Sequence, residues 1–442
     1  MKFFSTRNAA TVVGFKKAIL DCMPEDGGLY VPDDSSDLRR WILYADETTS
    51  FASIAGALTS AMINEEFSPI VCEAIATHAF PKDPVFRQLG ADTFILELYH
   101  GATGTFKDFG VSYLTSALET LLQMEGKKAI LLDATTGELG ACMAKAMEGK
   151  KLLKSVLLAP KGKFRGISES QFAWNGGTIY PVEVDGTEED CRNLVRTIFS
   201  CRELVEKYHL TVANTANIGR LLPQSFFYTY AFSRLKKTVS GDIFYALSAG
   251  NYGNLVSGLY GWKCALPVNG FIVPATSRLT LDARGDCMVM DSVIPLEKRN
   301  PADPADPSNI ERLEQIFKAN ALMLRSFVYP EPVSEEETSR ACKELFMKYR
   351  LYADRDTSAA YAALIKRKDT ALQEDGAAVL VARDCPSLNR QFLMHNLGEC
   401  PPLPETVAEA AAPVTLGRNA IAPGDKDSLI SILNSLNLLR LF

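Results

Sequence analysis

Several common signatures are missing from this chain of 442 residues. Its four histidines lie far apart and form no HExxH or Cys/His cluster, so no metal site is expected. Its ten cysteines are scattered without a CxxC pair, which is typical of free thiols in a reducing cytosol. No apolar run approaches the length of a membrane span, and the N-terminus has no signal-peptide core. We therefore expect a cytoplasmic protein.

The composition is that of an ordinary globular protein, with 47% apolar and 23% charged residues. The net charge of −6 argues against a nucleic-acid or membrane surface as the main partner. The length predicts two or three domains.

The pattern of apolar residues changes near residue 93. Residues 1–92 are expected to be mostly helical after a short strand. From 93 onward strands and helices alternate, which predicts an α/β fold with parallel sheets flanked by helices. We divide the chain into an N-terminal domain (1–92), an α/β region (93–426, with a smaller subdomain at about 125–215) and a C-terminal helix (427–442). Candidate strands cover 93–99, 128–133, 154–159, 178–183, 242–248, 268–273 and 377–382, and helical periodicity covers 187–207 and 221–236.

A proline-rich stretch at 300–307 is expected to be a loop, since proline breaks both periodicities. It is followed by Ser308 and Glu311, whose spacing predicts a capping box at a helix start.

Lys107 lies where a buried strand is expected to give way to a helix. The apolar run from Thr93 to Tyr99 predicts the strand, and a leucine-rich pattern after Val111 predicts the helix. The positive end of a helix dipole disfavours an ammonium ion, and burial lowers a lysine pKa further. A neutral amine can form a Schiff base. The alternative is an ordinary lysine that extends into solvent.

Three segments place polar residues at expected strand-to-helix turns. The turn Ser248–Asn254 is rich in glycine, so its N–H groups can converge on a phosphate, or it is simply a tight turn. The turn Ala134–Gly140 can bind a carboxylate or only cap a helix. Arg220 is either an anion ligand or a surface residue. Ligands of open α/β sheets bind at the carboxyl ends of the strands, and a phosphate-bearing cofactor that needs a lysine is pyridoxal phosphate.

Together these motifs resemble the threonine synthase family, which shares the tryptophan synthase β-like fold (fold type II) of pyridoxal-phosphate enzymes. The resemblance covers nearly the whole chain, and residues 1–8 and Asp26–Pro32 are similar to the family's N-terminal signature. The other similar segments are Glu97–Gly110 (family ELFHGPTLAFKDFG), Ala213–Leu221 (ANSINISRL), Ser248–Asn254 (PSGNFGN) and Pro307–Leu313 (PSNFERL).

The resemblance implies a carbon–oxygen lyase that converts O-phospho-L-homoserine and water to L-threonine and phosphate. Lys107 would hold the cofactor as an internal aldimine and act as base and acid. The cofactor phosphate would be held by Gly250, Asn251, Tyr252, Gly253 and Asn254. The substrate carboxylate would be bound by Thr135, Thr136 and Gly137. The substrate phosphate would be bound by Asn217, Arg220 and Lys163.

Some pocket motifs depart from the family pattern. The family's SGDTG corresponds to Thr136–Gly140, with Glu138 in place of the aspartate. Its TAHPAKF corresponds to Ala382–Leu388, where the hydroxyl that faces the cofactor's ring nitrogen is lost. We expect Asp384 of this segment to reach that nitrogen and keep it protonated.

These departures leave two alternatives open: a diverged pyridoxal-phosphate enzyme that eliminates or replaces at the β or γ carbon of another amino acid, and a cofactor-binding relic without activity. The expected partner is a small amino-acid substrate, with no nucleic acid and no membrane. The assembly is expected to be a monomer or a homodimer.

Overall fold

The larger of two parallel sheets has six strands in the order β14-β11-β10-β15-β5-β4. All neighbours are parallel except β4, which pairs antiparallel with β5 at one edge. The computed structural model describes residues 1–442 except 34–35, 64, 136, 318–319, 372–374 and 439–442. The strands are β4 (Val85–Gln88), β5 (Thr93–Glu97), β10 (Ile243–Ala246), β11 (Gly270–Pro274), β14 (Val328–Glu331) and β15 (Ala377–Ala382).

Helices cover both faces of this sheet, because its central strands are apolar on both sides. Alternate residues point to opposite faces: Phe244 packs with α14 and α15, whereas Tyr245 packs with α10 and α11. The bounds are α10 (Ser225–Leu235), α11 (Gly253–Lys263), α14 (Glu335–Tyr349) and α15 (Arg355–Ala371).

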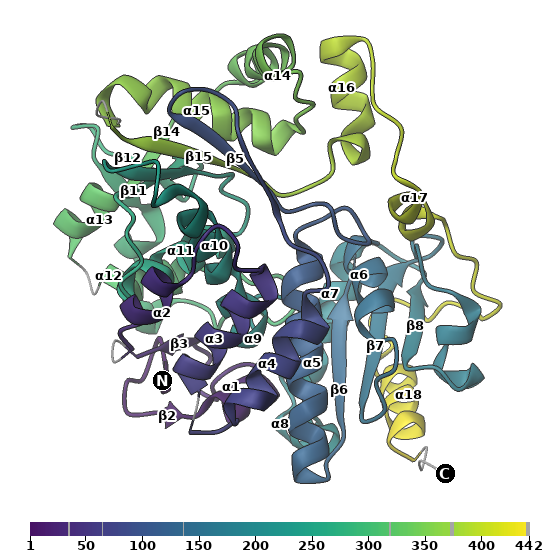
Figure 1. Cartoon of the computed structure of the whole chain (residues 1–442). Helices are drawn as coiled ribbons and strands as arrows, with labels where there is room; N and C mark the ends of the chain where they lie inside the picture. Colours follow the sequence, from purple (N-terminus) through teal and green to yellow (C-terminus); the bar gives the residue numbers. More distant parts are fainter. Residues whose placement is uncertain (34–35, 64, 136, 318–319, 372–374, 439–442) are drawn as a thin grey trace.

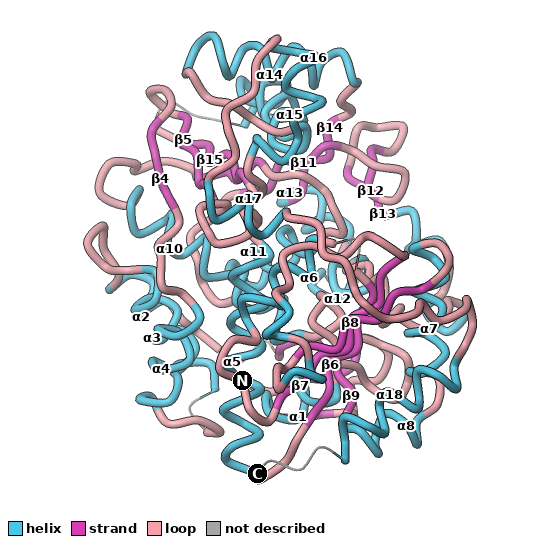
Figure 2. Tube along the Cα trace, turned by 90° about the vertical axis from the view of Figure 1, so that its right-hand side faces the viewer, coloured by secondary structure: helices cyan, strands magenta, loops and turns pink. Residues whose placement is uncertain are grey.

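The smaller sheet has four parallel strands in the order β8-β7-β6-β9 and lies apart from the larger one (Figure 2). Helices α5 and α6 pack on one face, and α7, α8 and α18 on the other. The bounds are β6 (Ala129–Ala134), β7 (Leu153–Pro160), β8 (Ile179–Val184), β9 (Leu210–Thr211), α5 (Lys107–Glu125), α6 (Glu138–Ala146), α7 (Glu188–Phe199), α8 (Arg202–Tyr208) and α18 (Lys426–Leu438).

The N-terminal residues form a small antiparallel sheet and four helices that pack against α5 and α10 (Figure 1). Aromatic rings join the two parts: Phe51 of α3 contacts Phe109 of α5 and Phe227 of α10. The bounds are β1 (Phe3–Ser5), β2 (Val12–Val13), β3 (Tyr30–Pro32), α1 (Phe15–Asp21), α2 (Arg39–Tyr44), α3 (Phe51–Ile63) and α4 (Pro69–Ala79).

The other elements connect these layers: a hairpin of β12 (Leu279–Leu281) and β13 (Cys287–Val289), and the helices α9 (Ile218–Leu221), α12 (Ile310–Phe317), α13 (Ala321–Phe327), α16 (Arg390–Leu397) and α17 (Glu405–Ala411). None of the helices in the described ranges has both the length and the apolar character to span a membrane.

The predicted α/β class with parallel sheets is confirmed. The region 187–207, predicted as one helical stretch, is divided into α7 and α8. The break falls where Ser200 and Cys201 separate them, with Cys201 in an extended conformation. The predicted capping box at Ser308 is not formed: α12 begins at Ile310, the Ser308 hydroxyl accepts from the Ile310 N–H, and the Glu311 carboxylate accepts hydrogen bonds from Thr6 and Arg7.

Candidate functional site

A cavity of about 320 Å³ lies where the two sheets approach each other. Four of the strands end at it: β5 leads to Lys107, β6 to Thr135, β10 to Asn251 and β15 to Arg383 and Asp384. This is the edge at which open α/β sheets bind ligands. The lining residues are Phe106, Lys107, Ala134, Thr135, Leu139, Glu188, Arg192, Ala213, Asn214, Thr215, Arg220, Gln224, Asn251, Ala305, Asp306, Pro307, Arg383 and Asp384.

Lys107 is the first residue of α5, and its side chain is 32% exposed. Its Nζ forms an ion pair with the carboxylate of Glu138, the first residue of α6. Lys107 lines the cavity, and this ion pair holds its amine, which is therefore not free in solvent.

Hydrogen bonds fix the loop that precedes Lys107. The Phe106 N–H donates to the Arg383 carbonyl at 2.8 Å, which ties the loop to the end of β15. The Asp108 carboxylate accepts from the backbone and the hydroxyl of Thr103, at 2.9 and 2.7 Å. Burial raises the pKa of Asp108, while the Thr103 hydrogen bonds oppose the rise. The residues directly before and after Lys107 are thus held by hydrogen bonds, which fixes the position of the lysine.

Arg220 of α9 is 4% exposed and lies beside α5. Its Nη1 is buried and has no hydrogen-bond partner among the described residues. It occupies space that Gly110 leaves open, because a Cβ on Gly110 would lie 2.0 Å from Nη1. Burial lowers the pKa of Arg220 to about 10, so the guanidinium stays charged at neutral pH. A buried charge with a free N–H favours an anionic ligand.

The glycine-rich turn after β10 is shaped by two residues with left-handed backbone, Gly250 (φ 47°) and Tyr252 (φ 65°). Asn251 lines the cavity, and its Nδ2 donates to the Thr215 hydroxyl at 2.9 Å. Its Oδ1 accepts from the Gly253 N–H at 3.2 Å. Asn254 is buried and donates to Gln224 at 2.8 Å. Asn251 thus reaches the cavity, while its neighbours hold the turn.

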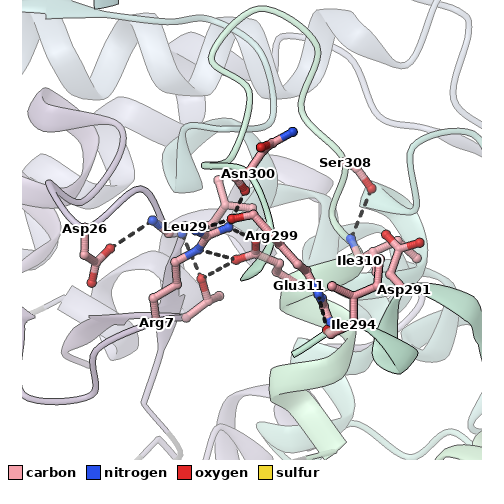
Figure 3. Close-up of polar contacts among 12 residues, drawn as sticks. Arg7, Asp26, Leu29, Asp291, Ile294, Arg299, Asn300, Ser308, Ile310 and Glu311 are labelled. Atoms are coloured by element: carbon pink, nitrogen blue, oxygen red, sulfur yellow. Dashed lines mark hydrogen bonds and ion pairs between the residues drawn. The ribbon is translucent and has the colours of Figure 1, made fainter. Parts of the chain in front are cut away.

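A strap, residues 300–307, closes one side of the cavity. Its far end is anchored to the N-terminal segment: Arg7 donates to the Asn300 carbonyl at 2.6 Å and pairs with Glu311 (Figure 3). The Ala302 N–H donates to the Gly27 carbonyl at 2.8 Å.

The near end of the strap meets the cavity itself. Asp303 accepts from Nε and Nη2 of Arg196 on α7, at 2.9 and 2.6 Å. Asn214 donates to the Pro304 carbonyl at 2.6 Å, and Asn251 donates to the Pro307 carbonyl at 3.2 Å. The strap therefore links both sheets and the N-terminal segment.

Comparisons with known proteins agree with this arrangement. Residues 2–80 match the model of the threonine synthase N terminus. Threonine synthase from Escherichia coli (strain K12) is 28% identical over 421 residues, covering 95% of this chain and 96% of the relative. Threonine synthase from Serratia marcescens is 28% identical over 412 residues, covering 92% of this chain and 94% of the relative. The crystal structure of the E. coli enzyme matches with a TM-score of 0.77 at 25% identity, over 98% of this chain and all of the other.

The chain is thus similar to threonine synthases over nearly its whole length. A structure described as pyridoxal-phosphate-bound threonine synthase from Brucella melitensis matches with a TM-score of 0.80 at 20% identity, over 99% of this chain and 100% of that one, which shows the shared fold.

Not all residues predicted from the family motifs line the cavity. Lys107, Thr135, Arg220, Asn251 and Asp384 line it. The Thr135 hydroxyl oxygen also accepts from the N–H groups of Gly137 and Gly140, at 3.0 and 3.1 Å, and so stabilises the start of α6. The predicted residues that do not line it are Gly137, Lys163, Asn217, Gly250, Tyr252, Gly253 and Asn254, and Thr136 lies outside the described residues.

Two predicted ligands of the substrate phosphate are placed elsewhere. Lys163 is exposed on the loop after β7. Asn217 is 0% exposed, and its side chain donates to the Ile19 carbonyl and the Thr211 hydroxyl while accepting from the Gly219 N–H. Its hydrogen-bonding capacity is used in holding α9, as is common for asparagine at a helix N-cap.

Asp384 lies at the altered family motif after β15. Its Oδ1 is buried without a hydrogen-bond partner in the described part of the chain. Burial raises the pKa of Asp384, and the charges of Arg383 and Lys107 oppose the rise. A contact with a cofactor nitrogen stays a prediction.

Sequence reasoning missed several residues of the cavity. Arg383 lies within Ala382–Leu388, but the corresponding family motif TAHPAKF has no arginine at this position, so the resemblance indicated no role for it. The strap residues were expected only to form a loop. Their proximity to the cavity depends on the Asn214 and Asn251 hydrogen bonds, which no local pattern predicts.

Proposed function

We propose that this chain is a pyridoxal-phosphate-dependent threonine synthase, which converts O-phospho-L-homoserine and water to L-threonine and phosphate. The observation that carries the proposal is one cavity that combines an amine, a buried free guanidinium and a glycine-rich turn. The family relatives are named threonine synthase over nearly the whole chain.

The residues at the cavity fit the cofactor. Lys107 is the only lysine among the described lining residues, so it is the amine that would hold the aldehyde group. The turn after β10 would hold the phosphate, and the Ser248 hydroxyl at its start is buried without a partner among the described residues. When bound, pyridoxal phosphate supplies an electron sink for charge that develops on the substrate carbons.

The substrate phosphate is assigned to Arg220. A guanidinium offers two parallel N–H groups to a phosphate, and burial strengthens such a charge-assisted hydrogen bond. Cavity-lining Thr135 stands at the start of α6, where it would orient the substrate carboxylate.

The proton transfers are assigned to Lys107. Its Nζ would take and return protons at the substrate carbons, as a positioned amine in a partly enclosed cavity can do. Glu138, paired with that Nζ, would hold the amine in place between these steps.

The test uses purified protein loaded with pyridoxal phosphate. We expect release of phosphate from O-phospho-L-homoserine with formation of an equal amount of threonine. Lys107→Ala should lose both the visible absorbance of the lysine-bound cofactor and the activity. Lys161→Ala, at an exposed position outside the cavity, is the matched control and should keep both.

Two outcomes would contradict the proposal. Cofactor-loaded protein that releases no phosphate and makes no threonine would favour a diverged enzyme or a relic. Full activity in Lys107→Ala would place the reactive amine elsewhere.

A further inference from the structure

Arg383 brings a further guanidinium to the cavity, at the end of β15, in addition to those of Arg192 and Arg220. Its side chain is only 12% exposed. Its Nη1 lies so close to the first glycine of the turn that a Cβ on Gly250 would be 2.7 Å away. Its Cζ lies 5.1 Å from the centre of the Phe106 ring. The guanidinium is therefore held between the glycine-rich turn and the residue before Lys107.

The hydrogen bonds of Arg383 are not all satisfied. Its Nη2 forms an ion pair with Asp356 at the start of α15. Its Nε is buried and has no partner among the residues that the structure describes. A buried guanidinium N–H without an acceptor is costly, so this position favours an additional anionic acceptor.

Of the three arginines that line the cavity, Arg192 pairs with Glu188 and Glu189, and the other two, Arg220 and Arg383, lie at different places around one ring. Arg220 is 5.8 Å from the Phe106 centre and lies against Gly110 of α5. Arg383 is 5.1 Å from the same centre and lies against Gly250. The cavity thus has one guanidinium beside helix α5 and another beside the turn.

We propose that Arg383 binds the phosphate group of the cofactor, as a charged donor added to the backbone N–H groups of the glycine-rich turn. The inference rests on the proposed function, because that function places the cofactor phosphate at this turn. It leaves Arg220 for the phosphate of the substrate, so that each phosphate monoester has its own guanidinium.

The experiment compares two ligands that differ only in the phosphate. Protein freed of cofactor is titrated with pyridoxal phosphate and with pyridoxal, and binding is followed by the absorbance of the lysine-bound form. Arg383→Gln keeps most of the side-chain volume and removes the charge. We expect it to weaken pyridoxal phosphate binding about ten- to a hundredfold, as for loss of a charged hydrogen bond, and pyridoxal binding less than about threefold. Arg383→Lys should fall between these values.

Two controls separate ligand binding from structure. Arg367→Gln removes another guanidinium that packs on a ring, 4.5 Å from Tyr329, and pairs with a carboxylate, Glu331, but lies outside the cavity. Asp356→Asn removes the ion-pair partner of Arg383 and keeps the guanidinium. Both should leave the ratio of the two affinities within about twofold of the wild-type ratio.

Each outcome decides a different point. If Arg383→Gln weakens the binding of pyridoxal phosphate and of pyridoxal equally, or the binding of neither, the assignment to the cofactor phosphate is overturned. If the variant weakens binding of O-phospho-L-homoserine relative to L-homoserine in the cofactor-loaded protein, and leaves pyridoxal phosphate binding unaffected, the guanidinium binds the substrate phosphate. The proposal is then wrong. If the wild type binds no pyridoxal phosphate at all, the proposed function itself fails. Arg383→Lys keeps the test informative should the glutamine variant fold poorly.

Discussion

Gly110 gives the sharpest test of Arg220, because the glycine is required for the arginine to lie where it does. A Cβ on Gly110 would lie 2.0 Å from Nη1 and 2.6 Å from the backbone oxygen of Arg220. The guanidinium can swing away from a methyl group, but the carbonyl of α9 can move only with its helix. Gly110→Ala should therefore displace Arg220 as a whole from the cavity wall.

The expected magnitude follows from these distances. Overpacking of this kind costs about 1–3 kcal/mol. Taking about 2.1 cal/mol/K per residue for a chain of 442 residues, that cost lowers Tm by roughly 1–3 °C. If Arg220 binds the substrate phosphate, loss of its charged hydrogen bonds lowers kcat/KM about ten- to a hundredfold. Affinity for pyridoxal phosphate should stay within about twofold.

The assay measures phosphate release from O-phospho-L-homoserine, together with Tm and cofactor affinity. Gly258→Ala is the matched control: its Cβ would lie 2.4 Å from Phe271, within the core around α11 and outside the cavity. It should lower Tm by a similar amount and leave kcat/KM unchanged. If Gly110→Ala loses stability as the control does but keeps its kcat/KM, Arg220 does not bind the substrate.

Two further predictions concern stability. Burial raises the pKa of Asp133 from 3.8 to about 7, so the folded protein holds more protons than the unfolded chain between these values. The free energy of unfolding should therefore fall as pH rises from about 4 to 7, by at most about 4 kcal/mol from this group. In urea denaturation Asp133→Asn should flatten the profile in part, since burial also raises the pKa of Asp354 to about 7; an unchanged slope would contradict the assignment. Asp303→Ala removes the acceptor of two Arg196 N–H groups, so protease cleavage within the strap should accelerate severalfold, as followed by mass spectrometry. Equal cleavage of both proteins would mean that the other anchors suffice.

The sequence predicted most of the central strands because their signal is local. β15 was predicted with its observed bounds, since Ala377–Ala382 is an uninterrupted apolar run. β14 was missed because Pro330 argues against a strand, yet β14 lies at the edge of the sheet, where proline is tolerated.

The site was predictable where a residue follows directly from strand and turn. Lys107 begins the helix that follows β5, and Asn251 lies in the turn that follows β10. The role of Asn217 was not predictable. An asparagine at a helix start can either cap the helix or bind a ligand, and only the contacts with Ile19 and Thr211 show that it caps the helix. The position of Arg383 at the cavity was not predictable either, because it depends on contacts with residues that are distant in sequence.

The pairing of β5 with β15 has a consequence for synthesis on the ribosome. Strand β5, which leads to Lys107, pairs with Ala378–Ala382, and Phe106 donates to the Arg383 carbonyl. The smaller sheet, by contrast, is complete once residue 211 has emerged. A nascent chain can therefore assemble the smaller sheet early, whereas the lysine has no parallel neighbour for its strand until the last part of the chain is translated. A message truncated before residue 377 would yield a partly folded product that cannot position its amine.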